Sequence, residues 1–287
     1  TQQQPLVIKT LGVDLQQDKY AVEQFQLEDW VSKRLKHDNL MQCYPHNTEK
    51  KYLFQCYEYL QGETLAQWLH RQEKPLNLDE ILPILQQTAL ALNAMHRLEM
   101  LHQDIRPKNI IVLNTESAMK IKLIDYGSTA VRGLVEINPK NANRALGTLA
   151  FMAPEYFIDH SPSVHSDQFS LAVMAYYLFT KQLPYGTDLA RCNSLKQMKK
   201  VQYHSIRKYR PDLPIWLDKI LGQALSIEPI HRFEALSELI HNLMHPSKEL
   251  LNSKPPAIIE RDPLRFWQMS CAVLGLLFLL SIAWPFI

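Results

Sequence analysis

The chain has 287 residues, 46% of them hydrophobic and 21% charged, and its formal net charge at pH 7 is +2. This composition excludes a disordered or fibrous chain, and the length suits one large domain or two small ones. The net charge decides nothing about partners, and we expect no nucleic-acid ligand. The four cysteines form no CxxC pair, which predicts neither a zinc site nor a disulfide framework and favours a reducing, cytosolic setting.

The first part of the chain has the pattern of a small mixed lobe. Apolar, β-branched runs predict strands over 5–11 (PLVIKTL) and 52–60 (YLFQCYEYL), and apolar residues at helical spacing predict a helix over 21–35. Further on, long stripes at the helical period predict helices over 78–98 and 166–180. We therefore expect an α+β fold in which a small mixed lobe is followed by a larger, mainly helical one.

Between the two long helices, charged and amide side chains stand beside apolar runs. The loop HQDIRPKN (102–109) leads into the apolar strand IIVL (110–113), and a second strand, KIKLIDYG (120–127), ends with another aspartate. Two short strands that each deliver a carboxylate or an amide to one end of a cleft are suited to holding a divalent cation against phosphates.

These motifs resemble those of eukaryotic-type (Hanks-type) serine/threonine protein kinases, above all the bacterial membrane-anchored members. HQDIRPKN resembles the catalytic loop, IDYG the metal-binding DFG motif and GTLAFMAPE (147–155) the end of the activation segment, in the family's order. The resemblance covers residues 5–245 and implies the two-lobed protein-kinase fold. It divides the chain into a partial small lobe with the hinge (1–60), a large lobe (61–245), a linker (246–265) and a transmembrane helix (266–287).

The resemblance assigns three residues of the loop to catalysis. Asp104 would orient the attacking hydroxyl or accept its proton, Asn109 would hold Mg²⁺, and Arg106 stands where most of these kinases have lysine. A guanidinium can also neutralise a transferring phosphoryl group, although its fork geometry differs from that of an ammonium. Asp125 of IDYG would be the second Mg²⁺ ligand, because carboxylate and amide oxygens suit this hard cation.

The small lobe would supply the ATP site. Lys9 in LVIK resembles the strand lysine that holds the ATP phosphates, and its expected partner is the helix residue Glu28, with Glu23 as the competitor. The hinge that binds adenine would follow, with Glu58 and Leu60 as binding residues.

In the large lobe the resemblance implies residues with a structural role. Glu155 of APE would pair with Arg232, and Asp167 would brace the backbone of the catalytic loop.

Together these features predict an ATP- and Mg²⁺-dependent kinase that transfers the γ-phosphoryl group to Ser or Thr of protein substrates. Two alternatives stay open: a weak or inactive kinase fold that acts as a scaffold, and a small-molecule kinase. Small-molecule kinases lack a segment like GTLAFMAPE, and a scaffold need not keep Lys9, Asp104, Asn109 and Asp125.

The start of the chain predicts a fragment. It begins at Thr1 rather than Met, and none of its eight glycines precedes Gly12, so the Gly-rich loop that covers the phosphates in this family is missing from it. We expect truncation of a longer protein and not loss of the loop. Some relatives carry a phosphatase domain upstream of the kinase, which makes such a domain a candidate for the preceding part.

One loop position bears on control. Gln103 stands where many of these kinases have an arginine that pairs with a phosphorylated activation-loop residue, and a neutral amide cannot form that charge-assisted pair. Residues 130–147 contain no Ser, Thr or Tyr. We therefore expect activity that does not depend on phosphorylation of this segment.

The sequence from 266 to 287 contains no charged residue and predicts a helix long enough to cross a bilayer. A buried helix is the alternative, but such helices are rarely apolar on every face over this length. Lysine and arginine residues precede the apolar stretch, which by the positive-inside rule predicts a single-pass C-terminal anchor with the kinase domain in the cytoplasm. Because the resemblance is to bacterial kinases, we expect this membrane to be the bacterial inner membrane.

Overall fold

The computed structural model describes residues 5–45, 53–114, 118–133, 149–158, 161–252 and 263–283. Contacts divide the chain into two compact units, Thr1–Ser247 and Lys248–Ile287. The first unit holds all the candidate site residues.

The small lobe of the first unit is built on a three-stranded antiparallel sheet. Its strands lie in the order β1 (Leu6–Thr10), β3 (Phe54–Glu58) and β2 (Cys43–Tyr44), and the register places Lys9 opposite Gln55. The two strands predicted from the apolar runs are therefore present, each shorter than predicted. β2 was not predicted, because two residues are too short to show a period.

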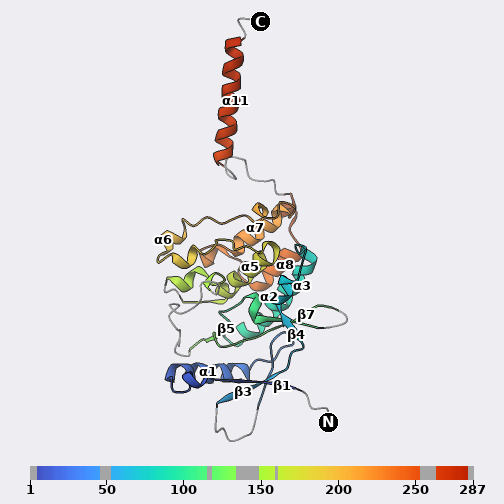
Figure 1. The fold of residues 1–287 in the computed structure, drawn as a ribbon, viewed down its shortest axis with the longest axis vertical. Helices are drawn as coiled ribbons and strands as arrows, with labels where there is room; N and C mark the ends of the chain where they lie inside the picture. The colour runs from blue at the N-terminus through green and yellow to red at the C-terminus, as the bar shows by residue number, and fades with distance from the viewer. Residues whose placement is uncertain are drawn as a thin grey trace. The chain divides into compact units, whose positions relative to one another are not determined.

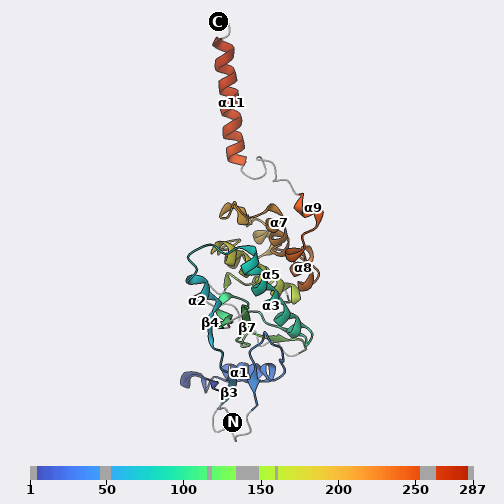
Figure 2. The ribbon, with the colours of Figure 1, turned by 90° about the vertical axis from the view of Figure 1, so that its right-hand side faces the viewer.

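One helix, α1 (Lys19–Ser32), lies beside this sheet (Figures 1 and 2). It begins before the predicted position because the Asp18 carboxylate accepts the N–H groups of Tyr20 and Ala21 and so caps the first turn. The buried Gln55 side chain of β3 donates to the Phe25 carbonyl at 2.8 Å and ties the helix to the sheet.

The large lobe is mainly helical, and its longest helices pack around α5 (Val164–Thr180). α3 (Leu78–His96) packs against α5 and α8 (Leu236–Met244), and α7 (Ile215–Ala224) packs against the same two helices. α5 is buried on nearly all sides. Its own small and apolar side chains are distributed around the helix and do not form a single apolar stripe. The shorter helices are α2 (Leu65–His70), α6 (Leu195–Met198) and the 3-10 turns η1 (Val13–Leu15), η2 (Pro107–Asn109), η4 (Pro154–Phe157), η5 (Leu189–Arg191), η6 (Ile206–Lys208) and η7 (Pro229–His231).

Besides the sheet of the small lobe, the first unit contains two smaller sheets. The first contains β4 (Gly62–Thr64), β6 (Ile110–Leu113) and β7 (Lys120–Leu123) in that order, and the second pairs β5 (Met100–Leu101) with β8 (Ala130–Val131). All pairs are antiparallel, so β6 and β7 deliver the ends of the loop and of the IDYG motif to neighbouring positions.

The strand predicted over 120–127 is wrong in its second half. The ladder ends at Leu123, and Asp125 has a φ of 64°, in the left-handed region that no strand residue adopts. The same conformation occurs at Gln103, with a φ of 65°.

In the second unit, the structure forms α9 (Lys248–Leu251) and α11 (Pro263–Ala283). Residues 284–287 and the side chains of 276–283, which belong to the predicted span, lie outside the described residues. Within the described part of the chain, no helix has the length and apolar character needed to cross a bilayer.

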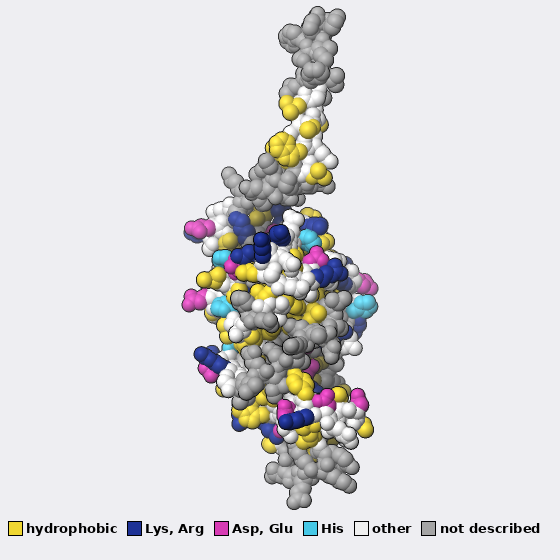
Figure 3. All heavy atoms as spheres, turned by 90° about the vertical axis from the view of Figure 1, so that its left-hand side faces the viewer, with side chains coloured by type: hydrophobic (Ala, Val, Ile, Leu, Met, Phe, Trp, Pro, Cys, Tyr) yellow, Lys and Arg dark blue, Asp and Glu magenta, His cyan; other side chains and the backbone are white. Residues whose placement is uncertain are grey.

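The surface agrees with the small net charge. Figure 3 shows both basic and acidic side chains on the described surface of one face of the first unit.

Candidate active site

The centre of the candidate site is the ammonium group of Lys9. Its Nζ lies 2.6 Å from Glu28 Oε1 and 3.1 Å from Asp125 Oδ1, which brings together β1, α1 and the turn after β7. The competing Glu23 instead lies 3.7 Å from Lys19. Two of the three ammonium protons are thus used, and the third has no acceptor among the described residues. It is available to an anionic oxygen such as that of a phosphate.

Burial and charge move the pKa values of this cluster in different directions. Burial alone would lower the pKa of Lys9, but the carboxylates of Glu28 and Asp125 outweigh it and the pKa is raised. Burial raises the pKa of Glu28, and Lys9 offsets this only in part. Burial would also raise the pKa of Asp125, yet the charge of Lys9 holds it below its ordinary value. At neutral pH the site therefore offers a cation and an ionised Asp125.

The loop HQDIRPKN folds back so that its last residue, Asn109, contacts Asp104. Asn109 Nδ2 donates to Asp104 Oδ2 at 2.7 Å and to the Asp104 carbonyl at 2.8 Å, and Arg106 Nε lies 3.5 Å from the same carboxylate oxygen. Asp104 Oδ1 has no donor within the described residues. One carboxylate oxygen is thus held by the loop, while the other can accept a hydrogen bond from a substrate hydroxyl.

A buried aspartate holds the backbone before Asp104. The Asp167 side chain is 0% exposed and accepts the N–H groups of His102 and Gln103 at 3.0 Å each. Its Oδ2 also lies 2.8 Å from His96 Nε2. These bonds stabilise the left-handed turn at Gln103 and thereby fix the direction in which Asp104 leaves the backbone.

The oxygens of Asn109 and Asp125 fit a Mg²⁺ ion. The Ile124 N–H donates to the Asn109 carbonyl at 2.9 Å, so the backbone just before Asp125 lies against Asn109. Asp125 Oδ1 accepts from Lys9 and Gly127, whereas Asp125 Oδ2 and Asn109 Oδ1 have no donor in the part of the chain that the structure describes. Mg²⁺ commonly takes one or two protein oxygens and completes its shell with water and phosphate. No group of three or more His, Cys, Asp or Glu gathers among the described residues.

The predicted hinge follows β3. The last residue of β3, Glu58, has its carboxylate bound to Lys122 Nζ at 2.6 Å, and Tyr57 is 1% exposed with its hydroxyl donating to Gln55 at 2.6 Å. The Leu60 N–H donates to no acceptor among the described residues, which leaves it open to an adenine nitrogen. Binding of adenine by Glu58 and Leu60 stays a prediction.

The predicted pair of the large lobe is present and buried. The Glu155 and Arg232 side chains are 4% and 0% exposed, with Arg232 Nη2 lying 2.9 Å from Glu155 Oε2. A guanidinium has five N–H groups. All five donate, to both oxygens of Glu155 and to the carbonyls of His165, Ser226 and Ile227.

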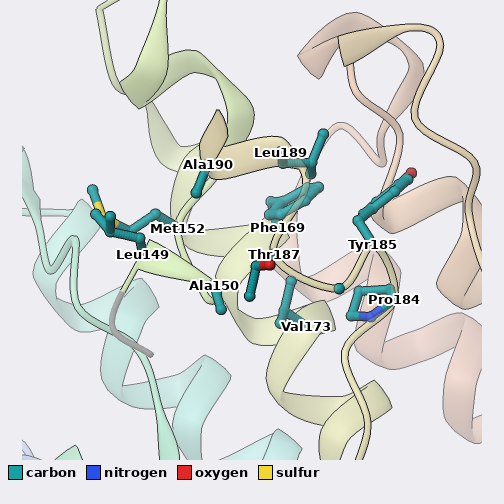
Figure 4. Close-up of a pocket in the computed structure, with 11 residues that line it drawn as sticks. Leu149, Ala150, Met152, Phe169, Val173, Pro184, Tyr185, Thr187, Leu189 and Ala190 are labelled. Atoms are coloured by element: carbon teal, nitrogen blue, oxygen red, sulfur yellow. The ribbon is translucent and has the colours of Figure 1, made fainter. Parts of the chain in front are cut away.

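A separate shallow hollow, partly open to solvent, lies in the large lobe. Figure 4 shows Leu149 and Met152 on one side of it and Phe169, Tyr185 and Leu189 on the other. The GTLAFMAPE motif itself contributes Leu149, Ala150 and Met152 to the lining, which is mainly apolar; the first two residues of the motif lie outside the described part. None of its lining residues belongs to the predicted ATP site.

Sequence reasoning missed the residues that connect the hinge to the large lobe. Lys122 stands in KIKL between the buried Ile121 and Leu123, and such a position is typical of an exposed lysine on an alternating strand. Asn39 donates to the Ile121 carbonyl at 2.9 Å, again without a sequence signal. Alternation indicates only that these side chains leave the core, and it cannot identify distant partners.

Comparison with known proteins agrees with this geometry. The profile of the family described as "Protein kinase domain" matches residues 1–246. Serine/threonine-protein kinase PrkC of Bacillus subtilis is 25% identical over 82% of this chain and 35% of its own length. Serine/threonine-protein kinase pkn3 of Myxococcus xanthus is 30% identical over 79% of this chain and 42% of its own length. The crystal structure of the Mycobacterium tuberculosis PknI kinase domain matches with a TM-score of 0.64 and 24% identity, over 84% of this chain and 86% of that one.

The two-lobed fold with a lysine, a glutamate and two aspartates at the junction defines a protein-kinase domain. The chain belongs to the protein kinase domain family, and its relatives include bacterial Hanks-type kinases. It spans only 35% to 42% of the length of the two curated relatives described above.

Proposed function

We propose that this chain is the catalytic domain of a kinase that transfers the γ-phosphoryl group of Mg-ATP to serine or threonine of protein substrates. The observation that carries the proposal is the contact of Lys9 with both Glu28 and Asp125, which joins both sides of the nucleotide site. Relatives that match most of the chain are named serine/threonine-protein kinases, which supports the same acceptor.

The proposed transfer follows from the roles of the chain's own residues. Asp104 Oδ1 orients the substrate hydroxyl and takes its proton as the hydroxyl oxygen bonds to the γ-phosphorus. The bond from that phosphorus to the β,γ-bridging oxygen breaks, and ADP leaves. Lys9 and Arg106 neutralise phosphate charge, while Asn109 and Asp125 would hold Mg²⁺, which offsets the charge of the phosphates.

The scaffold alternative is disfavoured by the hydrogen-bond donors and acceptors in the site that have no partner among the described residues. An ion pair that serves only the fold can use all its donors internally, as Arg232 does. Here the third proton of Lys9 and one oxygen each of Asp104 and Asp125 lack partners among the described residues, and the Lys9 and Asp125 side chains, 39% and 48% exposed, can be reached by a ligand. Open donors and acceptors that converge on one place support a ligand.

The test is transfer of labelled γ-phosphate from Mg-ATP to a generic protein substrate by the full-length protein. Asp125→Asn should abolish transfer, and Asp104→Asn should lower the rate by about 100-fold or more. Asp38→Asn is the matched control, because Asp38 is exposed and outside the site. Phosphoamino-acid analysis of the product should give phosphoserine or phosphothreonine. Equal labelling by all four proteins would refute the proposal, and label in small molecules alone would favour a small-molecule kinase.

Membrane anchoring is a separate proposal that rests on the uncharged sequence 266–287 alone. It would place the kinase domain on the cytoplasmic side of the bacterial inner membrane. The protein should then resist alkaline carbonate extraction and become soluble when the chain is ended at Ser247. Full-length protein in the supernatant would contradict the anchor without bearing on catalysis. An upstream phosphatase domain stays a further proposal, which the residues encoded before Thr1 would test.

A further inference from the structure

An ion pair links the predicted hinge to the large lobe. Lys122 Nζ on β7 lies 2.6 Å from Glu58 Oε1 at the end of β3, and the two side chains are 14% and 20% exposed. A lysine this far from solvent is unfavourable unless it is paired. None of the steps of the proposed transfer uses Lys122, so its burial calls for another explanation.

The same carboxylate holds a third segment. Glu58 Oε1 accepts the Gln42 N–H at 2.7 Å, and the Glu58 N–H donates to the Gln42 carbonyl at 3.0 Å. Lys122 Nζ also donates to the Leu40 carbonyl at 3.3 Å. Lys122 therefore bonds both to Glu58 and to the segment 40–42, which Glu58 also contacts.

That segment is itself bonded to the strand that carries Lys122. The Leu123 N–H donates to the Asn39 carbonyl at 2.8 Å, and the Met41 N–H donates to the Leu123 carbonyl at 3.0 Å. Asp125 follows two residues after Leu123 and contacts Lys9. The bonds at Lys122 thus connect the backbone predicted to bind adenine with the turn predicted to hold the metal and the phosphates.

We infer that Lys122 is a positioning residue for nucleotide binding, acting through Glu58. The pair fixes the hinge backbone at 58–60 relative to Asp125, so that one nucleotide can contact both ends of the site at once. Without the lysine, the partly buried Glu58 carboxylate loses its counter-charge and moves toward water, and it carries the hinge backbone with it. This inference rests on the proposed kinase function and adds a residue that the transfer chemistry does not require.

The experiment compares Lys122→Met with Lys120→Met in the full-length protein. Both lysines are on β7 and, two residues apart, on the same side of the strand, but Lys120 is exposed and has no partner among the described residues. The measured quantities are the Kd of Mg-ADP by calorimetry, the KM for ATP, kcat and the melting temperature. Lys122→Met should raise Kd and KM about tenfold and change kcat less than about threefold, while Lys120→Met stays within about twofold of wild type.

Two further variants separate positioning from folding. Lys122→Arg keeps the charge and should restore most of the nucleotide affinity. Glu58→Gln should raise Kd as Lys122→Met does, and the double variant should be no weaker than the worse single variant, because both substitutions remove the same interaction. If Lys122→Met does not fold, Glu58→Gln alone decides the question by the same Kd measurement.

Each outcome distinguishes the inference from the function on which it rests. A lower melting temperature with an unchanged Kd would show that the pair only stabilises the fold, and tighter binding or a higher kcat would show that it restrains the site. Either result overturns the inference while the wild-type kinase stays active. A wild-type protein that neither binds Mg-ADP nor transfers phosphate would overturn the proposed function and the inference with it.

Discussion

The ion pairs at the nucleotide site and inside the large lobe have similar geometry but different surroundings. Lys9 lies 2.6 Å from Glu28 and Arg232 lies 2.9 Å from Glu155, yet the Lys9 side chain is 39% exposed and the Arg232 side chain 0%. All five N–H groups of Arg232 donate to protein acceptors, whereas one ammonium proton of Lys9 has no acceptor among the described residues. The difference teaches that an ion pair marks a candidate ligand site when it combines a buried partner, as Glu28 is for Lys9, with a donor that a ligand can still reach.

The largest expected effect is on the folding of the large lobe. Arg232→Met removes one partner of a buried pair and leaves the Glu155 carboxylate without its counter-charge, which typically costs about 3–5 kcal/mol. Urea unfolding of the variant and of wild type measures the loss. A loss of unfolding free energy below about 1 kcal/mol would contradict the comparison, because the Arg232–Glu155 pair would then stabilise the fold no more than a surface pair does.

Lys9→Met should have the opposite profile. Phosphoryl transfer should fall by about 100-fold or more, because a group that neutralises phosphate charge is removed. The free energy of unfolding should fall by only about 1 kcal/mol, since the half-exposed lysine gains little from its pair and the Glu28 carboxyl, whose pKa is raised, can take up a proton. Rates and urea unfolding on the same preparation make the test. A loss of stability equal to that of Arg232→Met would remove the distinction between the two regions.

The two glutamates should also respond to acid in opposite ways. Burial alone would raise the pKa of Glu155, but the hydrogen bonds and charge of Arg232 hold it below its ordinary value of 4.5. As the pH falls below 4.5, the unfolded chain takes up this proton first, so the stabilisation that Glu155 gives above that value is lost. Glu28 has a raised pKa, and its contribution is lost instead as the pH rises through the folded-state value.

Unfolding free energies of wild type, Glu155→Gln and Glu28→Gln, measured from pH 6 down to about pH 3, test this pair of signs. Glu155→Gln should flatten the acid loss of stability, and Glu28→Gln should not. The same slope for both variants would contradict the assignment.

The smallest expected effect concerns phosphorylation. Gln103 carries no charge, and Nε2 of its buried side chain has no acceptor among the described residues. Residues 130–147 offer no acceptor hydroxyl. Phosphatase treatment, and Ser128→Ala with Thr129→Ala, should therefore leave initial rates within about twofold. A drop of about tenfold, equivalent to 1.4 kcal/mol in the barrier, would contradict the expectation: after phosphatase treatment alone it would show control by a phosphorylated residue elsewhere, and in the double variant control by Ser128 or Thr129.

How much of this could be predicted depended on the range of the interaction. The helices α3 and α5 follow from apolar periodicity, and the pairing of Lys9 with Glu28 follows from ordered motifs. The end of β7 at Leu123 does not, because the left-handed turn at Asp125 is held by contacts with distant segments. The ion pair of Lys122 and Glu58 joins residues 64 positions apart. It depends on the contact of β3, β7 and the segment 40–42, which no local sequence pattern encodes.

The left-handed backbone at Asp125 also decides how the position tolerates mutation. Asparagine and glycine adopt a φ of 64° readily, whereas a β-branched residue there is a genuine outlier. A saturation library at this codon should therefore split into three classes when abundance and activity are scored separately. Asparagine and glycine variants should be abundant but inactive, valine, isoleucine and threonine variants should be depleted as well as inactive, and aspartate alone should satisfy both demands.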